Sequence, residues 1–189
     1  MSTTPSDYAP ALIKRKSGPN WLLRTGVTAV IIVGGIAVLL PSLCQPRETA
    51  NRAKCASNLH QIGLAISLYA GEHGGQYPDS FATIMTSEQL SPAVFVCPSS
   101  NDEAAEGDSP TAVAANLTKP HHLSYVYLGN GLSTATVKKD MVIVYELPEN
   151  HQGDGMNLLF GDGHAEWVQM ARAKQLIAKA TTQPIATAK

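Results

Sequence analysis

Side chains that can bind a metal ion gather in a short stretch near the C-terminal end of the chain. Imidazole nitrogens and carboxylate oxygens are common ligands of Zn²⁺ and Ca²⁺, so this stretch is a candidate metal site. The alternative is structural, because an Asp-Gly pair suits a tight turn and neighbouring histidines can simply form hydrogen bonds. The spacing leaves both interpretations open. The stretch of sixteen residues contains His151, Asp154, Asp162, His164 and Glu166, of which the first four are the candidate ligands.

The three cysteines add a second possible chemistry. Cys44 ends a long apolar run, whereas Cys55 and Cys97 fall in the more polar remainder of the chain. If that remainder lies outside the cytoplasm, where thiols oxidise, a Cys55–Cys97 disulfide is expected. Two free, buried thiols are the alternative.

Sequence motifs typical of enzymes do not occur in the chain. There is no nucleophile elbow, no H-E-x-x-H zinc motif, and no glycine-rich loop followed by Gly-Lys-Ser or Gly-Lys-Thr. The formal net charge of −1 argues against a broad basic surface for nucleic acid. We therefore expect a protein that is not an enzyme, binds no nucleic acid and needs no cofactor.

An uncharged run of twenty residues, Thr25 to Cys44, predicts where the protein is located. As a helix it would be roughly 30 Å long, which matches the hydrocarbon core of a bilayer. A buried core helix and a cleaved secretory signal are the alternatives, but core runs are usually shorter and no A-x-A-like site follows. We expect a single transmembrane helix at 21–44 and a polar cytoplasmic tail at 1–20. Basic residues precede the run and favour a cytoplasmic N-terminus: Lys14, Arg15, Lys16 and Arg24.

The segment after the apolar run has the periodicity of an amphipathic helix, which we place at 45–75. One apolar stripe recurs at helical spacing, and Leu64 and Leu68 lie on the opposite side, where they are either ordinary surface or a contact for a partner. Gly71, Gly74 and Gly75 are expected to end the helix. The stripe consists of Cys55, Leu59, Ile62, Ile66 and Tyr69.

The remainder predicts an α+β domain at 76–170, followed by a C-terminal helix and tail at 171–189. Ser80 is expected to cap a short helix, and 99–120 reads as a long loop. Two runs rich in β-branched and aromatic residues predict strands, and two further apolar runs on either side of a short Asp-Gly turn predict a hairpin. A long N-terminal helix would then cover one face of a small antiparallel sheet. The predicted strands are 123–128, 141–147, 156–160 and 164–169, and the final helix extends over 170–180.

Three stretches together resemble bacterial type IV pilin-like proteins, in particular the pseudopilin-like group with a C-terminal H-x9-DG signature. The first is IAVLLPSLCQPRETANRAKCASNLHQIGLAISLYAGEHGGQYP, the second Phe95 to Ser99, and the third His151 through NLLFGDGHAEW. His151, Asp162 and Gly163 correspond to the signature, although ten residues separate His151 from Asp162. At the expected leader junction Gly26 is an atypical processing candidate, with Ile31 where the family has a glutamate.

The resemblance implies a pilin-like fold anchored in the inner membrane, with the α+β domain on the periplasmic side. It also implies a structural or scaffold role, in which the lipid bilayer and other pilin-like subunits of a secretion or pilus-type apparatus are the partners. Calcium in the C-terminal region is a further implication, since some secretion pseudopilins are stabilised by it. The alternatives are an anchored domain that does not assemble and binds a metal, a glycan or a protein, and an anchored hydrolase.

Overall fold

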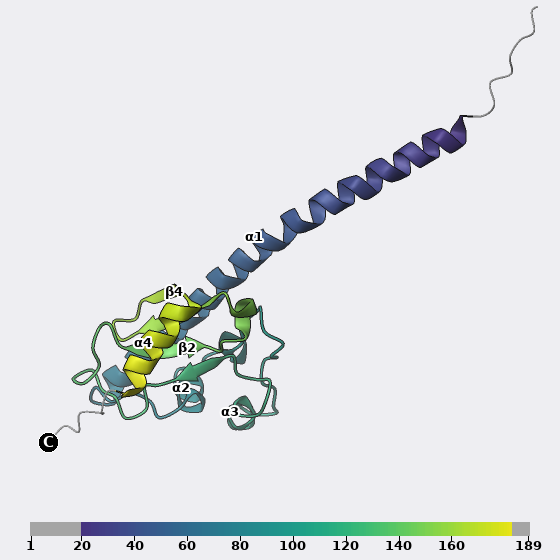
Figure 1. The fold of residues 1–189 in the computed structure, drawn as a ribbon. Helices are drawn as coiled ribbons and strands as arrows, with labels where there is room; N and C mark the ends of the chain where they lie inside the picture. Colours follow the sequence, from purple (N-terminus) through teal and green to yellow (C-terminus); the bar gives the residue numbers. More distant parts are fainter. Residues whose placement is uncertain (1–19, 183–189) are drawn as a thin grey trace, which may run out of the picture. The chain divides into compact units, whose positions relative to one another are not determined.

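The computed structural model describes residues 20–182, and within that range the side chains at 22–23 and 37–46 are not described. Almost all of the expected polar tail (1–20), the last residues of the C-terminal tail and the side chain of Cys44 therefore lie outside the description. The chain divides into two compact units, Met1–Leu43 and Cys44–Lys189. Both contribute to the first helix, α1 (Trp21–Glu72), which is coloured purple to blue in Figure 1.

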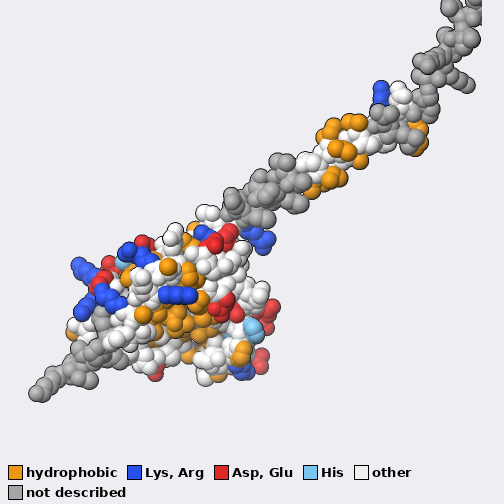
Figure 2. Space-filling view, in the orientation of Figure 1, with side chains coloured by type: hydrophobic (Ala, Val, Ile, Leu, Met, Phe, Trp, Pro, Cys, Tyr) orange, Lys and Arg blue, Asp and Glu red, His pale blue; other side chains and the backbone are white. Residues whose placement is uncertain are grey.

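In the first unit, the apolar side chains that the structure describes on α1 are exposed rather than packed. Val30 is 73% exposed and Ile31 is 66% exposed, and the orange side chains of this segment are visible in Figure 2. No helix in the described part of the chain combines the length and the apolar character that crossing a membrane requires.

The second unit has a four-stranded antiparallel sheet in the order β1-β2-β3-β4, which confirms the predicted α+β class. Each observed strand lies within one or two residues of the run that predicted it. The Asp-Gly turn joins β3 to β4 as expected, and Gly163 has a φ of 87°. The strands are β1 (Tyr125–Tyr127), β2 (Val142–Glu146), β3 (Gly155–Phe160) and β4 (Ala165–Gln169).

The C-terminal part of α1 covers one face of this sheet through the predicted stripe. Leu59, Ile62 and Ile66 are buried, whereas Leu64 and Leu68 on the opposite side are 57% and 52% exposed. The helix comes close to the sheet at Gly63, where a Cβ would lie 3.0 Å from a methyl group of Leu159 on β3. A glycine is needed there for the tight approach.

The other face of the sheet is covered by α4 (Met170–Thr182), the yellow helix of Figure 1. The sequence predicted this helix but not its position. We expected a helix on one face of the sheet only, whereas helices cover both faces. The reason is the composition of β3, which is apolar at both odd and even positions. Its residues at 157 and 159 face α1, whereas those at 156, 158 and 160 pack with α4, so the entire strand is buried.

Short helices fill the connections. α2 (Phe81–Ser87) begins as predicted, because the Ser80 hydroxyl accepts a hydrogen bond from the Thr83 amide at 3.2 Å. The expected loop at 99–120 is wrong in its second half, which forms α3 (Pro110–Leu117). Ser109 caps that helix and a proline occupies its first turn, a start signal that the loop prediction overlooked. Two 3₁₀ turns, η1 (Pro92–Phe95) and η2 (Asn150–Gly153), complete the unit.

The packing of α1 on the sheet predicts a contrast between two leucines of the same helix. Replacing the buried Leu59 by alanine should lower the free energy of unfolding by about 2–5 kcal/mol, because it leaves a cavity in the core. The matched change Leu64→Ala on the exposed side should stay within about 0.5 kcal/mol of wild type. Chemical denaturation of the full chain, followed by circular dichroism, measures both. Equal losses for the two variants would contradict this arrangement.

Candidate functional site

Four side chains that can bind a metal ion or exchange a proton meet inside the second unit, on the α1 side of the sheet. They are Cys55, Cys97, Glu146 and His151, and one donor atom of each lies within 4.8 Å of all the others. All four residues are at most 1% exposed. Among the described residues, this is the group of histidines, cysteines and acids arranged closely enough to hold a metal ion.

Each of the four comes from a different element. Cys55 belongs to the buried stripe of α1, and Cys97 lies two residues after the end of η1, just before Pro98. Glu146 is the last residue of β2, and His151 lies in the turn η2. The folded core, rather than any local motif, therefore assembles the group.

The turn that carries His151 has an uncommon backbone. His151 has a φ of 57° and Gln152 a φ of 60°, and Gly153 continues with a φ of 80°. Left-handed geometry costs a residue with a Cβ roughly 1–2 kcal/mol, so the surrounding contacts must hold it in place. Asn150 contributes, because its amide donates a hydrogen bond to the Ser124 carbonyl at 3.2 Å.

The His151 imidazole lies between two carboxylates. Its Nδ1 is 2.5 Å from Glu48 Oε1, and its Nε2 is 3.4 Å from both Glu146 and the sulfur of Cys97. Burial alone would lower the pKa of His151. Hydrogen bonds with Cys97, Glu146 and Glu48 outweigh this effect and raise the pKa to about 10. The ring is therefore a cation at neutral pH when no metal is bound.

Glu48 supports the ring from α1. Partial burial works to raise the pKa of this carboxyl, but hydrogen bonds from His151, Ser99 and Arg52 prevail and hold it below its ordinary value. The Ser99 hydroxyl donates at 2.9 Å and Arg52 Nε at 3.2 Å. Glu48 is thus an anion that three donors hold in place.

The two thiols are free and their sulfur atoms lie 2.8 Å apart. The Cys55 thiol donates a hydrogen bond to Cys97, which raises the pKa of Cys55 together with burial and the charge of Glu146. The same hydrogen bond, with others from His151 and the Ser99 amide, lowers the pKa of Cys97 to about 6 against the effect of burial. The expected Cys55–Cys97 pairing is thus spatially available and stays a prediction.

Glu146 is fully buried and its two carboxylate oxygens are both hydrogen-bonded by Asn157 on β3. The Asn157 backbone amide donates to Oε2 at 2.6 Å and its side chain donates to Oε1 at 3.1 Å. The same side chain also donates to the Arg52 carbonyl on α1 at 3.1 Å. Asn157 therefore links the acid of β2 to the helix that covers the sheet.

Trp167 and Arg52 pack beside the group. The indole ring of Trp167 meets the His151 ring edge-on, with centroids 5.2 Å apart, and the Arg52 guanidinium lies 4.1 Å from the centroid of the indole. Arg52 Nη2 also forms an ion pair with Asp154 Oδ2 at 2.9 Å. These contacts separate the group from solvent on the β4 side.

The four predicted metal ligands do not come together as the sequence suggested. His151 is in the core, and Asp154 pairs with Arg52 at the surface. Asp162 and His164 pair with each other at 2.5 Å in the exposed turn between β3 and β4. Strand β3 separates this turn from His151, so the structure does not bring the four side chains to one place. Hydrogen bonds from His164 lower the pKa of Asp162 below its ordinary value.

Sequence reasoning missed Glu146, Glu48 and Asn157. A signal for two of them was present, since an acid in the apolar run of β2 and an amide in that of β3 both occupy positions where side chains are buried. A buried polar group needs a partner, and pairing the two strands supplies it. Glu48 offered no such signal, because its role depends on the packing of α1.

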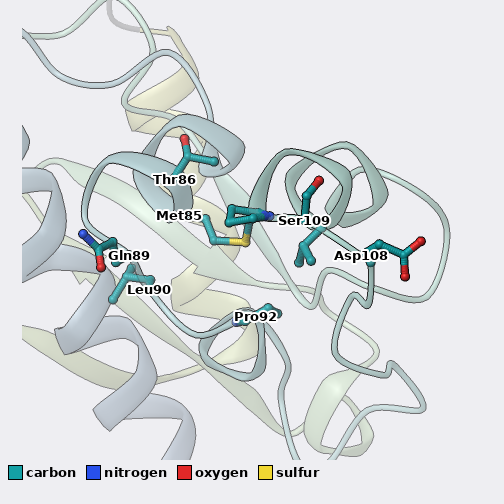
Figure 3. A pocket seen from close by; sticks show the side chains of 10 residues that line it. Met85, Thr86, Gln89, Leu90, Pro92, Asp108 and Ser109 are labelled. Carbon is teal, nitrogen blue, oxygen red and sulfur yellow. The ribbon is translucent and has the colours of Figure 1, made fainter.

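A separate cavity of about 510 Å³ lies beside α2 and α3 (Figure 3). Met85, Leu90, Pro92 and Val113 make much of its wall. Its lining includes no histidine or cysteine, and the hydroxyl of Ser109 already caps α3. The cavity can hold an apolar group but offers little chemistry.

Comparison of the chain with protein-family models, curated proteins and solved structures gave no match. The function is therefore inferred from the geometry of the site. This geometry shows a closed, charged and fully hydrogen-bonded centre that connects α1 to the sheet.

The role of Asn157 in this centre can be tested directly. Asn157→Ala removes two hydrogen bonds and leaves Glu146 with fewer partners in the core, so the free energy of unfolding should fall by about 1–3 kcal/mol. Asn51→Ala, which removes a hydrogen bond to Ser99 nearer the surface, is the matched control and should cost less. Denaturation followed by tryptophan fluorescence in a Trp21→Phe background reports on Trp167. A variant as stable as wild type would show that Glu146 does not need this partner.

Proposed function

We propose that the protein is a membrane-anchored, pilin-like structural subunit whose N-terminal segment is held in the inner membrane and whose α+β unit lies outside the cytoplasm. In this role it contacts other pilin-like subunits of a secretion or pilus-type apparatus. The proposal combines the apolar run of the sequence with two properties of the described residues.

The observation that carries the proposal is the contrast between the two units of the chain along α1. In the second unit the apolar residues of the helix are buried against the sheet, whereas in the first unit those described are exposed. Water does not tolerate a contiguous apolar surface of this kind, so lipid or another helix must cover it. The large exposed apolar side chains described there are Trp21, Val27, Val30, Ile31, Ile32, Val33 and Ile36.

Small residues in the same segment support contact with neighbouring helices. At Gly26, Gly34 and Gly35 an added Cβ would have no atom within 4 Å. Glycines on a helix surface allow another backbone to approach closely, which is how helices associate within membranes. This supports assembly through the anchor as well as simple attachment.

The buried centre supports a structural role rather than catalysis. Its four donor residues are at most 1% exposed, so a substrate has no direct access to them. Ser124, a possible nucleophile, is buried and its hydroxyl donates to Asp102 at 2.6 Å instead of to an imidazole. These observations favour a scaffold over the anchored hydrolase considered from the sequence.

The anchor predicts a clear effect of charge. The full chain expressed in bacteria should sediment with membranes and resist extraction by salt and alkali. The double change Ile31→Arg and Val33→Arg should release it, because each arginine near the centre of a bilayer costs about 2.5–3.5 kcal/mol on insertion scales. Leu64→Arg and Leu68→Arg, which place the same charges on the second unit, form the control and should leave fractionation unchanged.

Assembly is tested separately by crosslinking in membranes. Wild type should give a ladder of oligomers, and Gly34→Ile should weaken the ladder, whereas Val33→Ile should not. Intact mass determines whether the chain is cleaved at Gly26. A chain that is soluble without detergent contradicts the anchor, and a membrane-bound monomer contradicts assembly alone.

A further inference from the structure

We propose that Cys55, Cys97, His151 and Glu146 form a closed, four-coordinate zinc site that links α1 to the sheet of the second unit. The ligands are the two sulfur atoms, the Nε2 atom of His151 and one carboxylate oxygen of Glu146. This inference does not depend on membrane anchoring or assembly.

Two of the distances between donor atoms match those of a tetrahedral zinc site, and all of them lie within 4.8 Å. With a Zn–S length near 2.3 Å and Zn–N and Zn–O lengths near 2.1 Å, neighbouring ligand atoms lie about 3.4–3.8 Å apart. Cys97 Sγ and Glu146 oxygen are each 3.4 Å from His151 Nε2. The two sulfurs, at 2.8 Å, are about 1 Å closer than in such a site. A small rotation of one cysteine side chain would bring the two sulfur atoms to the separation that such a site requires.

The surroundings orient the ligands as partners of a metal site do. Histidine ligands usually donate their second ring N–H to a carboxylate, which fixes the tautomer that presents the other nitrogen to the metal. Glu48 accepts from His151 Nδ1 in this way and leaves Nε2 directed at the group. The Ser99 amide donates to Cys97 Sγ at 3.4 Å, and Asn157 holds the carboxylate of Glu146.

The donor set indicates the metal. Two thiolates and an imidazole favour zinc over calcium, which prefers six to eight oxygen ligands. Three anionic ligands outweigh the charge of Zn²⁺ by one, and Arg52 lies next to the supporting Glu48. Binding displaces the proton of the Cys55 thiol and the proton on Nε2 of His151, and these pass to solvent.

A route into the centre is available from the α1 side. A hollow of about 260 Å³ is lined by Glu48, Asn51, Ser99 and His151. Its polar oxygens include those of Glu48, whose side chain is 23% exposed. The hollow thus reaches the His151 side of the centre, where Glu48 would meet an entering ion first.

A Cys55–Cys97 disulfide is the competing arrangement, and the two exclude each other because a bonded sulfur is no longer a thiolate. A disulfide would need two of the four donors and would leave Glu146 and His151 as an ion pair. Convergence of four donors from four elements, three of which are held by a residue outside the group, favours the metal.

Cobalt, a spectroscopic probe for zinc sites, tests the proposal. The full chain is purified under reducing conditions in a Cys44→Ser background, so that the thiols present are Cys55 and Cys97. We expect one cobalt ion per chain, with thiolate-to-cobalt charge-transfer bands and the strong d–d bands of a tetrahedral site. One equivalent of zinc should abolish both sets of bands.

Variants identify the ligands. Cys97→Ser and Glu146→Gln should each lower cobalt affinity by more than about 100-fold, and Glu48→Gln, which changes a supporting residue, by about 10–100-fold. The double variant Asp162→Asn and His164→Asn, in the exposed turn, should bind like the parent. Circular dichroism establishes that each variant is folded. If the reduced chain proves unfolded until zinc is added, that also supports the site.

Three results would overturn the proposal. One is a folded chain with both thiols reduced that binds no cobalt. Another is cobalt binding without sulfur bands, or with affinity unchanged in Cys97→Ser. The third is a reduced chain that zinc does not fold but that folds once Cys55 and Cys97 are oxidised to a disulfide, which would assign the two sulfurs to a covalent link.

Discussion

The second unit depends on the contact between the His151 imidazole and two carboxylates, one on α1 and one on the sheet. Glu48 and Glu146 approach the ring from opposite nitrogens, at 2.5 and 3.4 Å. Removing charged groups from water is costly, and the cost is recovered only when every polar atom finds a well-placed partner. The strained backbone at His151 and the two hydrogen bonds from Asn157 exist to meet this requirement. Apolar packing of Leu59 and Ile62 brings the helix to the sheet, and the polar contacts of Glu48 and the Arg52 carbonyl add a second connection.

The elements of this fold could largely be predicted from sequence, because each depends on local patterns. Alternation and β-branched residues located the four strands, and Ser80 signalled the start of α2. What failed required knowledge of packing: the apolar run of β3 did not reveal that α4 would cover its second face. The helix at Pro110–Leu117 differs from the predicted loop. Its capping serine and first-turn proline are a local start signal, but they follow a polar, acidic segment that is typical of a loop.

The functional centre was harder to predict for a related reason. Cys55, Cys97 and His151 were recognised individually, but as two separate possibilities, a disulfide and a metal cluster at the C-terminal turn. Proximity in sequence favoured Asp162 and His164 as partners of His151, whereas the antiparallel hairpin places them at the far end of β3. Partners distant in sequence, such as Glu146 on a neighbouring strand, are found once the strand pairing is known.

The two units differ in which side chains they expose to water: apolar side chains are exposed in the first, and ionisable side chains are buried in the second. In the first, the apolar side chains that the structure describes, such as Val30, are exposed, and an apolar surface of this kind is unfavourable in water. In the second, ionisable groups are buried, and their partners come from within it. The polar centre of the second unit connects α1 to the sheet through hydrogen bonds of Glu48 and Asn157, and these add to the apolar contacts between the same elements.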